Sequence, residues 1–269
     1  MIERLKDLWA HRELLWNMTV KELKVKYKRS VLGFAWSFMN PLVMLLVFSI
    51  VFSILARGGE VQWYAAFLMS GLLPWLFFVN SLMQSVGSIV GNPGLVKKVY
   101  FPREILPIAA VGANIVHFLL QMMVFFAFLL IIRWHFSPWL LLMPVILILQ
   151  VMLTLGLALL VSAANVYLRD VQHFVEVALT AWFWLCPIVY PVGLVADRYP
   201  RFMPLYLANP MTNIVLLWEY VMYNPHHYGK QVAYLSFWGI FGTVVLSIVA
   251  LVGGYYVFTK TERGFAEQI

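Results

Sequence analysis

Apolar residues along this chain gather in long runs that short polar segments separate. A run of about 20 apolar residues is long enough to cross the hydrocarbon core of a bilayer as a helix. The fifth run is shorter than this and suits half of a broken helix. We expect six spans, at residues 34–55, 64–90, 105–132, 139–166, 175–190 and 234–258. The predicted fold class is all-α integral membrane, with a membrane domain over residues 34–258.

A different pattern fills residues 1–33, where basic side chains are interleaved with apolar ones at roughly helical spacing. Trp9 and Trp16 fall near one face of such a helix, and indole rings favour the membrane–water interface. We predict an amphipathic helix that lies in the interface, with a break at Arg12. A solvated helical tail is the alternative interpretation.

The segment between spans five and six, residues 191–233, is too apolar to be a plain loop. Asn209 followed by Pro210 is typical of a helix start, with an N-cap and a proline at the first helical position. The apolar run that follows, residues 211–223, is too short to span a bilayer. We therefore predict short external re-entrant helices in this segment.

Composition and charge fit a single membrane domain without a soluble one. Of the 269 residues 62% are hydrophobic and only 12% are charged, against about 25% charged residues in soluble domains. The formal net charge is +7, and fourteen of the nineteen Lys and Arg residues fall on the side that holds both termini. The positive-inside rule then places the termini, the tail 259–269 and the segment 91–104 in the cytoplasm. Basic residues that flank spans give no reason to expect nucleic-acid binding.

The predicted spans contain almost no ionisable residue with which to couple transport to an ion gradient. His117 in the third span is the exception among spans one, two, three, four and six, and a lone histidine usually packs in the core. No Gly-x-x-x-x-Gly-Lys-Ser/Thr motif is present, so the chain has no phosphate-binding loop. The acidic residues are scattered, which argues against a membrane-embedded lipid-linked glycosyltransferase.

Energy must then arrive through a separate subunit that docks from the cytoplasm. The segment 91–104 is the best candidate for the docking site, because Lys97 and Lys98 stand beside apolar residues on a predicted short helix. The alternative is an ordinary positive-inside turn whose lysines only fix the topology.

Residues 92–107 read Asn-Pro-Gly-Leu-Val-Lys-Lys-Val-Tyr-Phe-Pro-Arg-Glu-Ile-Leu-Pro. This sequence closely resembles the cytoplasmic loop of type-2 ABC exporter permeases, in the branch that exports O-antigen, capsular polysaccharide and teichoic acid. Further similar motifs cover essentially the whole chain, at residues 27–33, 167–171, 187–190 and 209–210.

The resemblance implies a homodimer with two ATP-binding cassette subunits, which would hold the ATP and Mg, so that no cofactor or metal is expected on this chain. The implied function is export of a lipid-linked, O-antigen-like polysaccharide across the bacterial cytoplasmic membrane. Teichoic acid or capsule export, or export of a small lipid or drug, is the alternative. Arg169 and Asp170 would cap the second cytoplasmic turn. The implied coupling segment has these residues: Asn92, Leu95, Val96, Lys97, Lys98, Val99, Tyr100, Phe101, Pro102, Arg103 and Glu104.

Aromatic residues make up 16% of the chain, and their rings can stack on the C–H faces of sugars. A polymer that must slide needs such contacts, which have no fixed hydrogen-bond register. Aromatic residues also form interfacial belts and pack between helices. The candidate pore-lining residues are Phe34, Phe38, Phe48, Phe52, Trp182, Phe183, Trp184 and Tyr190. Lys28 and Arg29 are candidates to bind the diphosphate of the lipid carrier or, by default, phospholipid headgroups.

Overall fold

The computed structural model describes residues 7–26, 35–55, 63–223 and 234–269, with the backbone alone at residue 26 and residues 52–55. Every regular element in these ranges is a helix, so the all-α prediction is confirmed for them. The α-helices are α2 (Arg12–Lys26), α3 (Trp36–Leu55), α4 (Tyr64–Val86), α5 (Pro93–Lys98), α6 (Ile105–Ile131), α7 (Met143–Tyr167), α8 (Val171–Trp184), α9 (Val192–Arg198), α10 (Met203–Leu207), α11 (Pro210–Tyr223), α13 (Phe237–Thr261) and α14 (Phe265–Gln268). Short 3-10 turns are η2 (Pro138–Leu142), η3 (Pro200–Phe202) and η5 (Glu262–Gly264).

Within the described ranges, four helical stretches are long and apolar enough to cross a membrane. They are Tyr64–Val86, Ile105–Ile131, Pro138–Tyr167 and Phe237–Gln268, which correspond to predicted spans two, three, four and six. Predicted span one forms α3, a helix of 20 residues that contains Pro41, and predicted span five forms α8, a helix of 14 residues.

The predicted bounds of the fifth span, residues 175–190, are wrong at both ends. α8 begins at Val171, directly after the turn that holds Asp170, and ends at Trp184. Pro187 explains the early end, because the residue before a proline is pushed away from helical geometry. Leu185–Tyr190 therefore forms a turn.

The N-terminal segment contains a helix interrupted close to the predicted position. Residues 7–10 are helical, a turn falls at His11, and α2 follows from Arg12. Trp9 and Trp16 are both largely exposed, so the indoles are available to an interface. α2 packs on α6, where Thr19 lies against Gly112.

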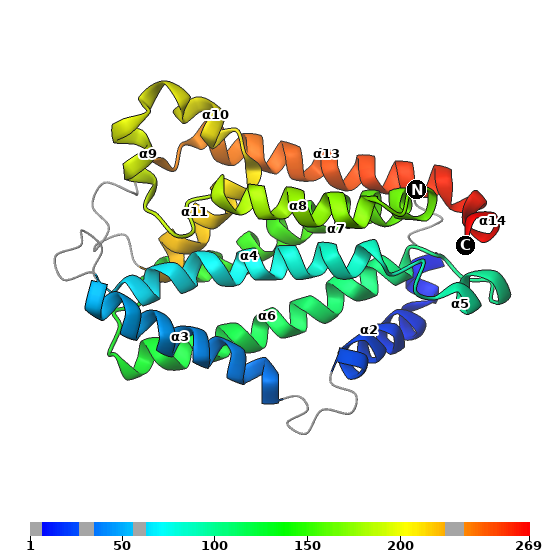
Figure 1. Cartoon of the computed structure of the whole chain (residues 1–269), viewed down its shortest axis with the longest axis horizontal. Coiled ribbons are helices and arrows are strands. Elements are labelled where there is room, and N and C mark those ends of the chain that lie inside the picture. The colour runs from blue at the N-terminus through cyan, green and yellow to red at the C-terminus, as the bar shows by residue number, and fades with distance from the viewer. Residues whose placement is uncertain (1–6, 27–34, 56–62, 224–233) are drawn as a thin grey trace.

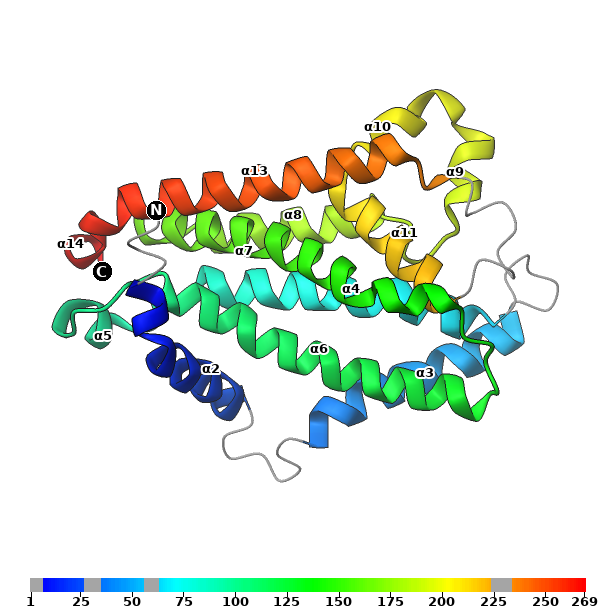
Figure 2. The ribbon, with the colours of Figure 1, turned by 180° about the vertical axis from the view of Figure 1, so that it is seen from behind.

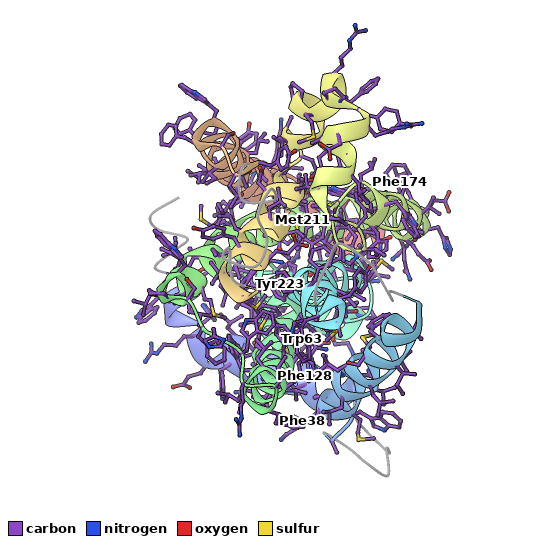
Figure 3. All side chains as sticks on the ribbon, turned by 90° about the vertical axis from the view of Figure 1, so that its left-hand side faces the viewer. Phe38, Trp63, Phe128, Phe174, Met211 and Tyr223 are labelled. Carbon is purple, nitrogen blue, oxygen red and sulfur yellow. The ribbon has the colours of Figure 1, made fainter. Side chains whose placement is uncertain are left out.

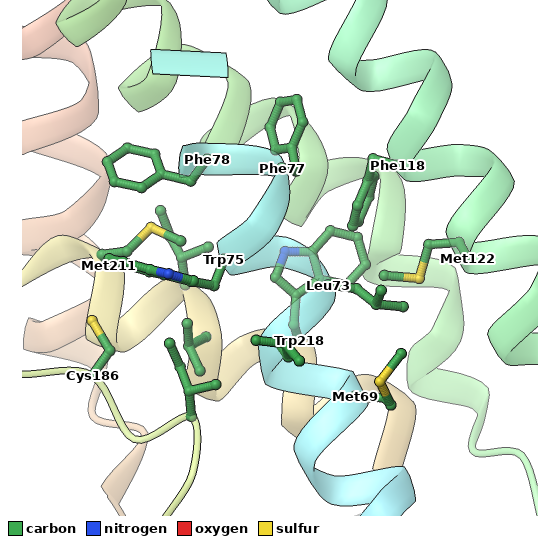
Figure 4. Close-up of a cluster of buried hydrophobic side chains, with 14 of the residues drawn as sticks. Met69, Leu73, Trp75, Phe77, Phe78, Phe118, Met122, Cys186, Met211 and Trp218 are labelled. Atoms are coloured by element: carbon green, nitrogen blue, oxygen red, sulfur yellow. The ribbon is translucent and has the colours of Figure 1, made fainter. Parts of the chain in front are cut away.

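α4 runs through the middle of the molecule and packs against α3, α6, α7, α8 and α11 (Figure 1). Its aromatic side chains Trp75, Phe77 and Phe78 enter a core that also takes Phe118 from α6 and Trp218 from α11 (Figure 4). The Trp218 indole donates to Gln150 Oε1 on α7 (2.7 Å), and Gln150 Nε2 donates to the Pro74 carbonyl (2.7 Å). One buried amide thus satisfies groups on two other helices, as hydrocarbon surroundings require.

α7 and α13 meet along a seam where their backbones touch. A Cβ on Gly254 would collide with the Gly156 backbone, and a Cβ on Gly156 would collide with the backbone at Ala250. Helices in lipid associate through such small residues, because they allow close van der Waals contact without a hydrophobic driving force. The glycines therefore fix how α13 lies on α7.

Different short helices lie at the two ends of the bundle. α5 and α14 lie at one end, and α9 and α10 lie at the other, in both the front and the back views (Figures 1 and 2). The start of α2 is at the α5 end (Figure 2). The predicted coupling segment and the C-terminal helix therefore share an end of the molecule.

Candidate functional site

The predicted coupling segment contains the short helix α5. Pro93 takes the first helical position, where a missing N–H does no harm. Lys97 and Lys98 form the last turn, where positive charge suits the helix dipole. The backbone becomes extended at Val99, so the chain leaves the helix there.

The coupling segment divides into an exposed tip and a buried base. The tip is residues 97–100: all four are exposed, and Tyr100 is 100% exposed. The base is formed by Val96, Phe101 and Glu104, which are all buried. A fully exposed tyrosine beside an exposed valine is the kind of apolar surface that a partner protein covers.

The base is held by a second hydrophobic core at this end of the bundle. Val96 and Phe101 pack there with Leu159 of α7, Phe258 of α13 and Phe265 of α14. Polar contacts add to this packing. Lys21 of α2 donates to Asn92 Oδ1 (2.6 Å), and the Arg103 guanidinium donates to the Glu262 carbonyl. A load on the tip would therefore reach α2, α7 and α13 directly.

A cavity of about 310 Å³ lies beside the tip. Its walls run from Val99 to Glu104 and include Asp7, Glu262 and Arg263 from the two terminal segments. Side chains of both charges line it, so it suits a polar protein surface better than a lipid tail.

Arg169 and Asp170 lie in the exposed turn between α7 and α8. Asp170 precedes the first residue of α8, but its side chain makes no capping hydrogen bond. The backbone closes the turn instead, through the bond from Val171 N to the Leu168 carbonyl (3.1 Å).

A groove of about 380 Å³ runs between α4 and α8. Trp75, Val79 and Met83 form its α4 wall, at helical spacing along one face. The α8 wall consists of these residues: Glu176, Leu179, Thr180, Phe183 and Trp184. The end-on view of Figure 3 places α3 and α8 on the same side of α4.

The outer surface of α8 carries a polar stripe next to the groove. His173, Glu176 and Thr180 are exposed and spaced three and four residues apart, and exposed Trp184 continues the same face. Polar side chains on a membrane helix face protein or a water-filled path rather than lipid. The stripe was present in the sequence and could have marked this wall of the groove.

α11 holds the turn that ends α8. Asn209 Oδ1 accepts from Met211 N (3.0 Å), which confirms the predicted N-cap, with Pro210 as the first helical residue. The same oxygen accepts from the Trp182 indole (3.0 Å), and Thr212 donates to the Leu185 carbonyl (3.2 Å). α11 and the turn 185–190 therefore form one body.

Glu219 of α11 is a residue that sequence reasoning missed. It is 3% exposed, and its Oε1 has no hydrogen-bond partner among the described residues. It lies against α4, where a Cβ on Gly71 would be 2.8 Å from that oxygen. A lone acid within a short apolar run was the available signal.

Residues 13–223 match the family model described as ABC-2 type transporter. This chain belongs to the ABC-2 type transporter family. The resemblance seen in the coupling segment is thus confirmed over most of the chain.

Three relatives of this ABC-2 chain match it over about three quarters of its length or more. The O-antigen export system permease protein RfbA of Myxococcus xanthus is 30% identical over 273 residues, 100% of each chain. RfbA of Klebsiella pneumoniae is 32% identical over 256 residues, 95% of this chain and 94% of the relative. The polysialic acid transport protein KpsM of Escherichia coli is 24% identical over 204 residues, 74% and 76% of the two chains.

The structure gives the predicted aromatic residues of this ABC-2 chain different surroundings. Phe183 and Trp184 lie together in the groove, with ring centroids 5.3 Å apart, and Phe183 also contacts Trp75. Trp182 instead packs on Phe78 and bonds to Asn209. The Tyr190 hydroxyl donates to the Trp184 carbonyl (2.7 Å) and pairs with Tyr206, whose pKa burial raises.

On span one, Phe38 and Phe48 are partly buried against the central core. Phe34 and the Phe52 side chain lie outside the described residues, as do Lys28 and Arg29. Trp75 on α4 also lines the groove, although no pattern in the sequence singled it out.

Proposed function

We propose that this ABC-2 chain is the permease subunit of an ATP-driven exporter of a lipid-linked, O-antigen-like polysaccharide in the bacterial cytoplasmic membrane. The observation that carries the proposal is the likeness, over nearly the whole chain, to two proteins named O-antigen export permeases. The ATP and Mg would be bound by the partner subunits.

The geometry of the coupling segment supports the docking role. A tip that presents Tyr100 on a rigid base can receive force without deforming, because the base belongs to the same core as α7 and α13. Movement of the partner subunit would then be transmitted to whole helices. A cytoplasmic location for this end follows from the basic tip and the positive-inside bias.

The arrangement of α3, α4 and α8 supports a homodimer in which each chain crosses the membrane six times. α3, with 20 residues, and α8, with 14, would complete the six crossings. They stand on the same side of α4 (Figure 3), so two copies that face each other would enclose a path with α4 as its floor. The polar stripe of α8 would border that path, where its side chains could be hydrated.

The groove between α4 and α8 fits a sugar chain. Trp75, Phe183 and Trp184 offer flat apolar faces, while Glu176 and Thr180 offer hydrogen-bond acceptors and a donor. None of the described side chains that line the groove is basic, so these side chains give it no preference for a phosphate. α9 to α11 would cover the outer end of the path as the re-entrant segment.

Capsule polysaccharide export is the second candidate. It is favoured by the likeness to KpsM and to a capsule export protein named CtrC of Neisseria meningitidis, which is 26% identical over 274 residues. Both relatives are less similar to this chain than the RfbA proteins, so O-antigen-like export is preferred.

Deletion of the gene tests the function. We expect loss of the long-chain polysaccharide from the cell surface and accumulation of the lipid-linked polymer inside the cell, with rescue by the native chain. The native chain should also co-purify with an ATP-binding subunit. Normal surface polysaccharide in the deletion strain would remove the proposal.

A further inference from the structure

A second, smaller pocket lies between α3, α4 and α6, away from the α4–α8 groove, and has a volume of about 70 Å³. Six uncharged hydrogen-bonding side chains from the three helices meet there: Ser37, Asn40, Asn80, Asn114, His117 and Gln121. His117, which looked like an ordinary core histidine in the sequence, is thus part of a polar cluster.

The pocket is unusual because α4 and α6 are spanning helices. Asn114, His117 and Gln121 recur at spacings of three and four residues, so one face of α6 is polar near the middle of its length. Asn40 and Asn80 are exposed on the outside of the molecule. Amides that face hydrocarbon are strongly disfavoured, so something polar must cover this face.

The chemistry of the lining identifies what covers it. Amides and an imidazole both donate and accept hydrogen bonds, as a hydroxyl group does. Among the described residues no Asp, Glu, Lys or Arg lines the pocket to bind a metal ion or a phosphate. Three rings, Trp36, Phe77 and Phe118, supply apolar faces. A ligand rich in hydroxyl groups and C–H faces matches both sets.

The pocket is also held in shape. Ser37 Oγ and His117 Nδ1 lie 3.2 Å apart, which ties α3 to α6. Asn114 Nδ2 donates to Gln84 Oε1 (2.7 Å), and Gln84 Nε2 donates to Glu22 of α2 (2.7 Å). Side chains fixed in this way lose little freedom when a ligand binds.

The geometry points to a carbohydrate subsite: we propose that the α3–α4–α6 pocket takes the hydroxyl groups of one sugar residue of the exported chain. Its volume equals about two waters at ~30 Å³ each, so it holds one or two hydroxyl groups while the ring lies against Asn40 and Asn80. The inference rests on the proposed function and adds to the path of the polymer a second contact point, separate from the groove.

Photo-crosslinking in cells that make the polymer tests the subsite. Benzoylphenylalanine replaces Asn80 in the full chain, Trp184 in the groove as a second site, and Met123, an exposed residue of α6, as the control. We expect a ladder of polymer-sized adducts at positions 80 and 184 that periodate destroys, and none at position 123.

The outcomes separate the two proposals. A ladder at 184 without one at 80 overturns the subsite and keeps the export function. A single small adduct at position 80 means that a phospholipid glycerol group occupies the pocket, which also overturns the subsite. No ladder at either position speaks against polysaccharide export itself.

A substitution pair at His117 gives an independent measurement. Gln keeps a donor and an acceptor, whereas Leu removes both, so H117L should slow export about fivefold more than H117Q, the effect of one hydrogen bond of ~1 kcal/mol. The readout is the export rate per correctly folded transporter, with yield and basal ATP hydrolysis measured in parallel. Equal export by the two variants would overturn the role of the pocket.

Discussion

The seam between α7 and α13 and the groove between α4 and α8 are built in opposite ways. Along the seam, Gly156 and Gly254 bring the backbones of α7 and α13 into contact. Along the groove, Trp75 and Phe183 keep α4 and α8 apart around a space of about 380 Å³. At the seam, the backbones are so close that the helices cannot shift without a clash. At the groove, the large rings leave a space that the proposed polysaccharide could occupy. We therefore predict that the seam holds the helices in place and that the groove is the proposed export path.

The seam should be the most sensitive place in the membrane domain. Gly254→Ala puts a Cβ into the Gly156 backbone, and because backbone cannot move aside as a side chain can, we expect a loss at the upper end of the ~1–3 kcal/mol typical of overpacking, or more. The yield of monodisperse protein and its thermal stability measure this. The neighbouring Gly253→Ala has open space and should behave like the native chain. Equal stability of the two variants would show that the seam is not fixed.

The second largest effect is expected from substitutions in the tip, which should weaken partner binding strongly and leave folding unchanged. Tyr100→Ala removes a fully exposed ring, and loss of a central aromatic contact of ~2 kcal/mol weakens association about 30-fold. Co-purification of the ATP-binding subunit and ATP hydrolysis measure it. Trp139→Ala, an exposed aromatic elsewhere on the surface, is the control. Undiminished co-purification by Tyr100→Ala would mean that the partner docks elsewhere.

Within α8, the two tryptophans on either side of Phe183 should give different defects. Trp184 is 63% exposed in the groove, so Trp184→Ala should lower export several-fold at normal protein yield, through loss of ~1 kcal/mol of ring stacking. Trp182→Ala removes the bond to Asn209 and should lower thermal stability instead. Export assays and melting curves on both variants decide the matter. If Trp184→Ala exports normally, the groove is not the path.

The smallest effect is expected at Glu219. An ionised carboxylate at this buried position would need a partner, and Oε1 has none among the described residues, so the neutral form is expected. Glu219→Gln keeps the shape of the side chain without its charge and should change stability less than any destabilising substitution named above. Glu219→Asp, which shortens the side chain, is the comparison. Strong destabilisation by the Gln variant would show that the charge itself matters.

The sequence predicted most of what depends on local order. The N-cap at Asn209, the break next to Arg12 and a helix at Lys97 and Lys98 are all set by residues within one or two turns of each other. The end of the fifth span was predicted wrongly at residue 190. α8 ends before Pro187, whereas the apolar residues continue beyond it.

What the sequence did not predict depends on which helix faces which. Spacing shows that His117 and Asn114 share a face of α6, but not that Asn80 and Ser37 come from other helices to meet them. The same is true of Gly156 with Gly254, and of Trp75 with Phe183. Apolar helices all look suitable to lie next to one another, because lipid and protein interior are equally apolar.

The division of the coupling segment into tip and base has an evolutionary consequence. The residues that fold this end of the bundle, Val96, Phe101 and Glu104, are separate from the four that stand in solvent. If the ATP-binding subunit docks on the tip as proposed, replacing residues 97–100 would alter which ATP-binding subunit is bound while leaving the membrane domain intact. A transporter arranged in this way can change partners by a few substitutions and keep its cargo, so motor and cargo specificity can diverge independently.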